Sequence, residues 1–262
     1  MQEYIVASLS GGKDSTAMVL EMIARGERID EVLCCDTYKE FPAMYRHLDK
    51  VKAVIRSHGI KITELRNEKS FDYWMFEHKV NHRNKELAGK LGYSWAGPLS
   101  RWCTSKLKID VIEKYMTQLR KKYKVITCTG IAADEGYRLV RDNNMQEGQR
   151  HPLVEWGWTE ADCLKYCYDH GYDWEGLYEI FDRVSCWCCP LQSLEDLRRL
   201  RKHFPELWEE LMEMDGKTWR QMKSTYSVEE LEVRFELEDE RQAQGLSINN
   251  KEFFTELKKR IS

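Results

Sequence analysis

One short segment near the N-terminus combines the residue types that bind phosphate groups. It reads Ser10, Gly11, Gly12, Lys13, Asp14, Ser15. The glycines let the backbone approach a ligand closely, and free amides at the start of a helix face an anion. Lys13 adds a positive charge, the serines add hydroxyl donors, and Asp14 offers a carboxylate that orients Mg2+ or holds the loop itself. We therefore predict a phosphate-binding loop; a Gly-Gly turn with a helix cap and no ligand is the alternative.

A second set of reactive side chains crowds a single turn late in the sequence, at Cys186, Cys188 and Cys189. The spacing Cys186-x-x-Cys189 lets two thiolates bind one metal centre. Thiolates without paired histidines suit a four-iron four-sulfur (4Fe-4S) cluster or a structural zinc ion, and free thiols without metal are the third interpretation. Cys188 is either a further ligand or a free thiol that carries sulfur.

The elements that must position these side chains alternate between strand and helix. Apolar runs at residues 4–9, 31–35, 60–65 and 124–129 predict strands, and apolar residues at helical spacing follow the first two runs and recur at 106–119. Such alternation predicts an α/β fold, a twisted parallel sheet with helices on both faces. The phosphate loop then lies between the first strand and the first helix.

The last third of the chain reads as mostly helical. A Thr-x-x-Asp cap at Thr159 predicts a helix that ends near residue 171, and further helices are expected at 193–203, 205–214 and 227–244. A final short helix follows residue 250. We place the boundary at Pro190, which gives a catalytic domain over residues 1–190 and a helical extension over 191–262.

Composition excludes several classes of protein. The 262 residues are 42% hydrophobic and 32% charged, and no segment approaches the ~20 apolar residues that cross a bilayer, so we expect no membrane partner. A secretory leader is not evident, which predicts a cytoplasmic location. The net charge of −3 argues against a basic nucleic-acid surface over the whole molecule. Basic stretches at 120–124 and 198–203 leave a nucleic-acid partner open, with solvated helix ends as the alternative.

The loop SGGKDS matches neither the Walker pattern nor the dinucleotide turn, and it resembles the PP-loop of ATP pyrophosphatases, which cleave ATP between its α and β phosphates. Five more segments follow in order: DTYKEFPAMY, RWCTSKLKI, GIAADEGYR, HPLVEW and SCWCCP. Together these segments, spread over residues 4–190, resemble the phosphoadenosine phosphosulfate (PAPS) reductase family.

The resemblance assigns further residues. It implies that Asp36 and Thr37 contact the nucleotide and that Cys103 is a further metal ligand. Arg138 falls in a matching segment, where its guanidinium suits phosphate or sulfate, with ion pairing as the alternative. Asp134 and Glu135 orient a substrate or a metal-bound water, or are solvated or paired with Arg138.

The function predicted first is the binding of ATP, or a related adenine nucleotide, with Mg2+, followed by adenylation of a substrate and sulfur transfer. Lys13, Asp14 and Arg138 would do the chemistry, and a sulfur donor or a thiol reductant protein would be the partner. A sulfonucleotide reductase that releases sulfite is the second hypothesis. Such reductases, by family resemblance, carry a nucleophilic cysteine near the C-terminus, whereas the last cysteine here is Cys189. A non-catalytic nucleotide-binding module is the third.

Overall fold

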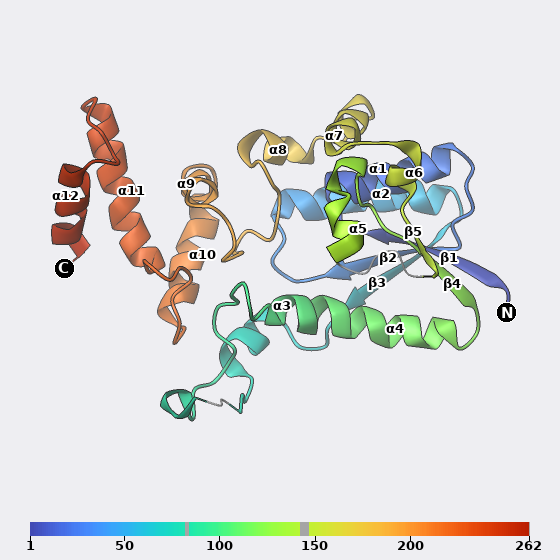
Figure 1. The fold of residues 1–262 in the computed structure, drawn as a ribbon, viewed down its shortest axis with the longest axis horizontal. Coiled ribbons are helices and arrows are strands. Elements are labelled where there is room, and N and C mark those ends of the chain that lie inside the picture. The colour runs from blue at the N-terminus through green and yellow to red at the C-terminus, as the bar shows by residue number, and fades with distance from the viewer. Residues whose placement is uncertain (82–83, 142–146, 262) are drawn as a thin grey trace. The chain divides into compact units, whose positions relative to one another are not determined.

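The computed structural model describes residues 1–81, 84–141 and 147–261 (Figure 1). The chain forms two compact units: unit 1 comprises Met1–Ser70 and Cys103–Cys186, and unit 2 comprises Phe71–Trp102 and Trp187–Ser262. The sequence also predicted two parts, but it divided them at residue 190 and left residues 71–102 in the first. Among the described residues, no helix combines the length and apolar content needed to cross a bilayer.

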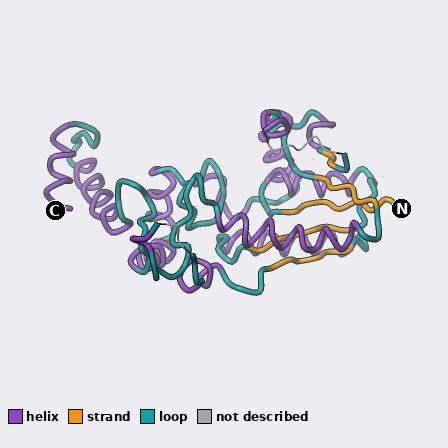
Figure 2. The backbone as a smooth tube through the Cα atoms, turned by 60° about the horizontal axis from the view of Figure 1, so that its bottom comes forward, coloured by secondary structure: helices purple, strands orange, loops and turns teal. Residues whose placement is uncertain are grey.

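Unit 1 is built on a parallel sheet with the strand order β3-β2-β1-β4-β5. Its strands are β1 (Glu3–Leu9), β2 (Glu31–Asp36), β3 (Lys61–Arg66), β4 (Lys124–Cys128) and β5 (Gln149–Arg150). Figure 2 shows the strands of this sheet running side by side, in orange. The predicted parallel α/β fold is confirmed, and the four predicted strands lie within one residue of their expected bounds. Only β5, which has two residues, has no signal in the sequence.

Helices cover both faces of this sheet. Unit 1 contains α1 (Lys13–Ala24), α2 (Pro42–Ser57), α4 (Asp110–Arg120), α5 (Tyr137–Arg141), α6 (Pro152–Trp156), α7 (Glu160–Asp169) and α8 (Leu177–Ile180). Helix α4 lies on one face, and α1 and α2 lie on the other (Figure 1). On the α4 face, Val6 and Leu33 pack against Met116. Successive strand residues point to opposite faces, so Ala7 and Leu9 face α1 and α2, and both are buried.

The helix predicted at 106–119 begins with a wider π-helical turn, Ser105–Ile109, before α4. Two of its carbonyls are bound from outside the helix. The Cys35 thiol donates to the carbonyl of Leu107 at 3.1 Å, and the Asn67 amide donates to that of Lys106 at 2.8 Å. These bonds compete with the hydrogen bonds of a regular α-helix, which accounts for the wider turn. The sequence pattern does not reveal the wider turn because both partners lie far away along the chain.

A buried carboxylate ties three strands of unit 1 to α4. The Glu31 side chain is 0% exposed, and it accepts hydrogen bonds from Tyr115 at 2.6 Å, Tyr4 at 3.1 Å and the Thr63 hydroxyl. Lys61 Nζ lies 3.0 Å from the same carboxylate. Burial alone would raise the pKa of Glu31, but these donors outweigh burial and hold the pKa below its usual range.

Unit 2 consists of the helices α9 (Leu194–His203), α10 (Pro205–Gly216), α11 (Val228–Ala243) and α12 (Lys251–Ile261), with the segment Phe71–Trp102. Short turns at Tyr73–Glu77 and Lys85–Leu87 and the turn α3 (Trp102–Thr104), which begins at the unit boundary, complete the described elements of this region. Ser193 and Ser227 form capping boxes at the starts of α9 and α11. The predicted helical C-terminal region is confirmed.

Buried Asp215 explains why residues 71–102 belong to unit 2. Its carboxylate accepts hydrogen bonds from the indole of Trp95 at 2.6 Å and from the backbone amides of Met222 and Val228 at 2.9 and 2.8 Å. Trp95 is 1% exposed. A buried indole N–H needs an acceptor, and this one lies 120 residues away in the sequence.

Replacement of Glu31 by alanine should destabilise the protein, because it leaves three partly buried hydroxyls and an ammonium group without their acceptor. We expect the free energy of unfolding to fall by about 3 kcal/mol, measured by urea denaturation. Glu3→Ala is the matched control: Glu3 is 52% exposed and pairs with Lys124 at the surface, so its loss should cost less than about 1 kcal/mol. Equal effects of the two substitutions would contradict this account of Glu31.

Candidate nucleotide-binding site

The phosphate loop lies where the order of the strands reverses. Strand β1 is paired with β2 on one side and with β4 on the other, and the loop leads from β1 directly into α1. In open parallel sheets, ligands bind at the carboxyl ends of the strands at such a switch point. The segments that follow β1 and β4 therefore flank the place where a ligand is expected.

Two glycines allow the backbone segments at this place to meet. Gly11 has φ +86°, and a Cβ atom there would lie 2.7 Å from the sulfur of Met44. A Cβ atom on Gly130, just after β4, would lie 2.9 Å from the backbone of Ser15. Only glycine fits both positions without a shift of its neighbours. The segment after β4 thus rests directly on the first turn of α1.

The serines of the loop differ in role. Ser15 is buried; its hydroxyl donates to the carbonyl of Gly12 at 3.1 Å and accepts from the amide of Ser10 at 3.1 Å. It therefore closes the loop on itself. The Ser10 side chain is exposed, and its hydroxyl lies 3.0 Å from that of Ser15.

Lys13 is held by two carboxylates. Its ammonium group lies 3.0 Å from Glu160 at the start of α7 and 3.3 Å from Asp14. Burial disfavours the charged form, but the two carboxylates outweigh burial and raise the pKa of Lys13 above its usual value. The lysine is therefore charged at neutral pH and lies at the N-terminus of α1.

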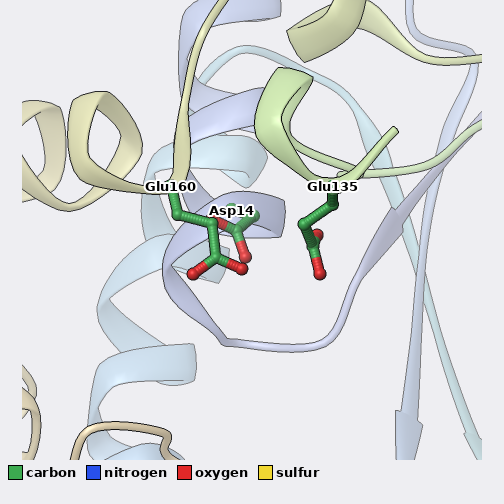
Figure 3. A group of neighbouring side chains, drawn as sticks. All are labelled: Asp14, Glu135 and Glu160. Carbon is green, nitrogen blue, oxygen red and sulfur yellow. The ribbon is translucent and has the colours of Figure 1, made fainter. Parts of the chain in front are cut away.

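Asp14, Glu135 and Glu160 form a cluster of three carboxylates, with one oxygen of each within 4.8 Å of the others. Figure 3 shows these side chains converging from three segments of the chain. Burial and the charges of Glu160 and Glu135 raise the pKa of Asp14 to about 6, although Lys13 opposes the shift. Oδ1 of Asp14 is buried without a hydrogen-bond partner. Carboxylate oxygens in this arrangement fit a hard cation such as Mg2+.

Arg138 forms an ion pair with a residue of the carboxylate cluster. Its guanidinium donates to both oxygens of Glu135, at 2.8 and 2.7 Å. This is the ion pair that the sequence left open. Arg138 therefore lies beside the cluster of three carboxylates, and its predicted contact with phosphate stays a prediction. The neighbouring Asp134 accepts from the amide of Glu160 at 3.1 Å, which joins the segment after β4 to the start of α7.

Asp36, the last residue of β2, and Thr37, which follows the strand, form hydrogen bonds with neighbouring residues. Asp36 accepts from the amide of Tyr38 at 2.8 Å and from the hydroxyl of Tyr45 at 2.9 Å. Thr37 is 3% exposed, and its hydroxyl donates to Glu40 at 2.8 Å. Both residues shape the turn after β2, so their assigned contact with a nucleotide remains a prediction.

The four cysteines predicted as metal ligands divide between the two units. Cys103 begins the second stretch of unit 1 and Cys186 ends it, whereas Cys188 and Cys189 belong to unit 2. Within unit 1, the Cys186 thiol lies 3.4 Å from the carboxylate of Glu40.

The charge of Lys108 interacts with Glu40 and with three thiols of unit 1. Burial opposes its charge, but Glu40, Cys186, Cys35 and Cys103 raise the pKa of Lys108. Soft thiol donors beside a fixed positive charge fit an iron-sulfur cluster or zinc in their chemistry.

Three residues that the sequence did not single out support the loop. Glu160 follows the predicted cap at Thr159, but its contact with Lys13 spans 147 positions. Trp174 donates from its indole to the carbonyl of Gly11 at 2.7 Å. His47, 3% exposed on α2, stacks on Trp174 and lies 3.0 Å from the Thr16 hydroxyl of α1. These contacts join residues far apart in the sequence, so no local sequence pattern predicts them.

Two arginines of the basic stretch 198–203 in unit 2 form ion pairs with acidic residues of α11. Arg198 pairs with Glu238 at 2.5 Å, and Arg201 pairs with Glu232 at 2.8 Å and Asp239 at 2.7 Å. These acidic partners all lie on α11. Arg198 and Arg201 belong to the basic stretch that suggested a nucleic-acid partner, and both form ion pairs within the protein instead.

The sheet order, the glycine-rich loop at the switch point and its lysine define an α/β protein with a PP-loop. The chain belongs to the family described as the phosphoadenosine phosphosulfate reductase domain, whose model matches residues 4–192. The resemblance inferred from the ordered motifs is thus confirmed.

Two curated relatives come from Methanocaldococcus jannaschii. The uncharacterized protein MJ0066 is 27% identical over 216 residues, which cover 80% of this chain and 41% of that protein. The uncharacterized protein MJ0973 is 27% identical over 215 residues, which cover 78% of this chain and 46% of that protein. The chain therefore spans less than half the length of these relatives.

Among solved structures, the U34-tRNA thiolase NcsA from Methanococcus maripaludis, with its 4Fe-4S cluster, is similar to this chain. It is 13% identical, with a TM-score of 0.40, and the match covers 90% of this chain and 73% of that one. A likeness this distant supports no conclusion about the site.

Buried His47 should make stability depend on pH. Burial, with the nearby Lys50, lowers the pKa of His47 from 6.5 to about 4, although Asp173 opposes the shift. The unfolded chain therefore takes up this proton first, and stability should fall by up to about 3 kcal/mol as the pH drops from 6.5 towards 4. Urea denaturation at several pH values measures the effect. His47→Phe should flatten this pH dependence, whereas His58→Phe, at an exposed position, should not; identical profiles for all three proteins would refute the assignment.

Proposed function

We propose that this chain binds ATP, or a related adenine nucleotide, at Ser10–Ser15 and activates a substrate by adenylation with release of pyrophosphate, in the service of sulfur transfer. One observation supports the proposal most directly: a charged lysine, a glycine-rich helix start and three carboxylates converge at the switch point of the sheet. These are the groups that hold a nucleotide triphosphate together with its cation. Family membership is consistent with this use of the loop.

Asp14, Glu135 and Glu160 would hold Mg2+. Their clustered oxygens and the unpartnered Oδ1 of Asp14 fit this ion. When bound, Mg2+ supplies positive charge that neutralises the phosphates. Because the ion would take over the carboxylates, the ammonium of Lys13 would lose its present partners. The Lys13 ammonium group would then bind the phosphate oxygens of a nucleotide at the N-terminus of α1.

The proposed reaction is displacement at the α-phosphate. A substrate oxygen forms a bond to the α-phosphorus, the bond from that phosphorus to the bridging oxygen breaks, and pyrophosphate leaves with the electron pair. Lys13 and the loop amides would stabilise the negative charge that develops on the phosphates, which needs rigid positioning and no proton transfer. The Ser15 hydroxyl, which closes the loop, contributes that rigidity.

The cysteines would supply the sulfur chemistry. We propose that Cys103, Cys186, Cys188 and Cys189 hold an iron-sulfur cluster, with zinc as the alternative. When bound, such a cluster provides electron transfer or a site that delivers sulfur. Within unit 1, Lys108 would offset the negative charge of the thiolates of Cys103 and Cys186, and Thr37 and Glu40 would orient Cys186 through their contacts with its thiol.

The second candidate function is reduction of a sulfonucleotide with release of sulfite, and it rests on the match to the PAPS reductase domain. The two candidates differ in nucleotide and product. Adenylation requires ATP and yields pyrophosphate, whereas reduction requires a sulfonucleotide and a thiol reductant and yields sulfite. Side-by-side assays with both nucleotides distinguish them.

Lys13→Ala should weaken ATP binding in the presence of Mg2+ by at least about 10-fold, because it removes a charged partner of the phosphates. Isothermal titration calorimetry measures the affinity, and labelled ATP should give AMP and pyrophosphate as products. Lys165→Ala is the matched control, because the Lys165 side chain on α7 is 75% exposed. This variant should bind ATP with wild-type affinity. Unchanged binding by Lys13→Ala, or ADP as the product, would argue against the proposal.

Metal content tests the role of the cysteines. Anaerobically purified wild-type protein should contain about four iron and four sulfide per chain, and Cys186→Ala should lose them together with the visible absorption band. Cys128→Ala serves as control, because this thiol is buried in β4 away from the predicted set. Stoichiometric zinc would make the cysteines structural, and metal-free wild-type protein would leave them as thiols; either result would reject the cluster.

A further inference from the structure

A strained turn follows α7 in unit 1. Trp174, Glu175 and Gly176 all have positive φ, at 50°, 54° and 83°. Side-chain-bearing residues rarely adopt this conformation, and two in succession persist only where their surroundings hold them. The Asp173 carboxylate accepts from the amide of Glu175 at 3.0 Å, which fixes the turn from within.

Both strained side chains are anchored to the elements around the phosphate loop. The Trp174 ring is 1% exposed, stacks on His47 with 4.3 Å between centroids and donates to the carbonyl of Gly11 at 2.7 Å. Glu175 accepts two hydrogen bonds from Arg46 of α2, at 2.7 and 2.5 Å. The turn is therefore fastened to the loop on one side and to α2 on the other.

Tyr178 follows the turn, and its side chain contacts the phosphate loop. The ring of Tyr178 packs edge-on against Trp174, with 4.7 Å between centroids. Its hydroxyl oxygen accepts a hydrogen bond from the amide of Lys13 at 3.0 Å, and a Cβ atom on Gly12 would lie 3.5 Å from that oxygen. A hydroxyl thus lies against an amide of the first turn of α1, where an anion would be received.

The hydroxyl of Tyr178 still has its own hydrogen to donate, because its bond with Lys13 uses only a lone pair of the oxygen. Burial raises the pKa of Tyr178 above its usual value, so the group stays protonated at neutral pH. The Tyr178 hydroxyl and the Lys13 amide, which now donates to it, are therefore two donors that one incoming oxygen atom could accept from.

We propose that Tyr178 is a ligand of the nucleotide phosphates, and that the turn at Trp174–Gly176 positions it. A phosphate oxygen entering the loop would take over the amide hydrogen of Lys13 and accept the hydroxyl hydrogen of Tyr178. Trp174 and the pair Arg46–Glu175 are positioning residues, which act through the turn. This inference rests on the proposed binding of an adenine nucleotide at the loop.

The test compares Tyr178→Phe with wild type, using ATP with Mg2+, inorganic pyrophosphate with Mg2+, and adenosine as calorimetric titrants. The substitution keeps the ring that packs on Trp174 and removes only the hydroxyl. We expect affinity for ATP and for pyrophosphate to fall about 10-fold, as for one hydrogen bond to a charged group, and affinity for adenosine to stay unchanged. Tyr168→Phe, in the same aromatic group with its ring 6.5 Å from that of Trp174, is the control and should match wild type.

The outcomes separate this inference from the function on which it rests. Equal loss of affinity for adenosine, or a melting temperature lowered enough to explain the loss, would assign Tyr178 a structural role and overturn the inference. If Lys13→Ala weakens ATP binding while Tyr178→Phe binds ATP with wild-type affinity, the inference about Tyr178 is wrong and the proposed function stands. If wild-type protein binds neither ATP nor pyrophosphate, the proposed function fails and the inference with it.

Discussion

The contact of Gly130 with the backbone of α1 is the constraint on which the site depends. No side chain fits between Gly130 and Ser15, so the segment after β4 lies directly on the first turn of the helix. This contact brings Glu135 to the side of Asp14, and the same region joins the start of α7 through Asp134. Asp14 and Glu135 therefore meet because their two backbone segments touch, and Glu160 joins them from the start of α7.

Charge crowding at this place is unusual for a site without a ligand. Lys13 pairs with two of the three carboxylates, Asp14 and Glu160, and Arg138 pairs with Glu135. The pKa of Asp14 rises to about 6 because burial and its acidic neighbours disfavour a further negative charge. Such an arrangement costs folding free energy unless a cation compensates it. Sites that keep costly charges together commonly do so for function. The crowded carboxylates are therefore the part of unit 1 that the proposed binding of Mg2+ would stabilise.

The sequence predicted those parts of the molecule that depend on local patterns. The parallel sheet, the glycine-rich loop and the helix capped by Thr159 follow from periodicity, glycine spacing and cap chemistry. Tyr178 was not predicted, because its bond to Lys13 joins residues 165 positions apart. The place of residues 71–102 in unit 2 was missed for the same reason, since it depends on the buried bond from Trp95 to Asp215. Tertiary contacts of this kind leave no periodic signal.

The sheet of unit 1 ends at strands that discourage further pairing. Strand β3 lies at one edge and exposes Lys61, Glu64 and Arg66, which are 55%, 54% and 59% exposed. Strand β5, at the other edge, offers only two residues. Charged side chains and short edge strands both oppose the addition of a strand from another molecule. The chain can therefore keep an open sheet without promoting aggregation through its edge strands.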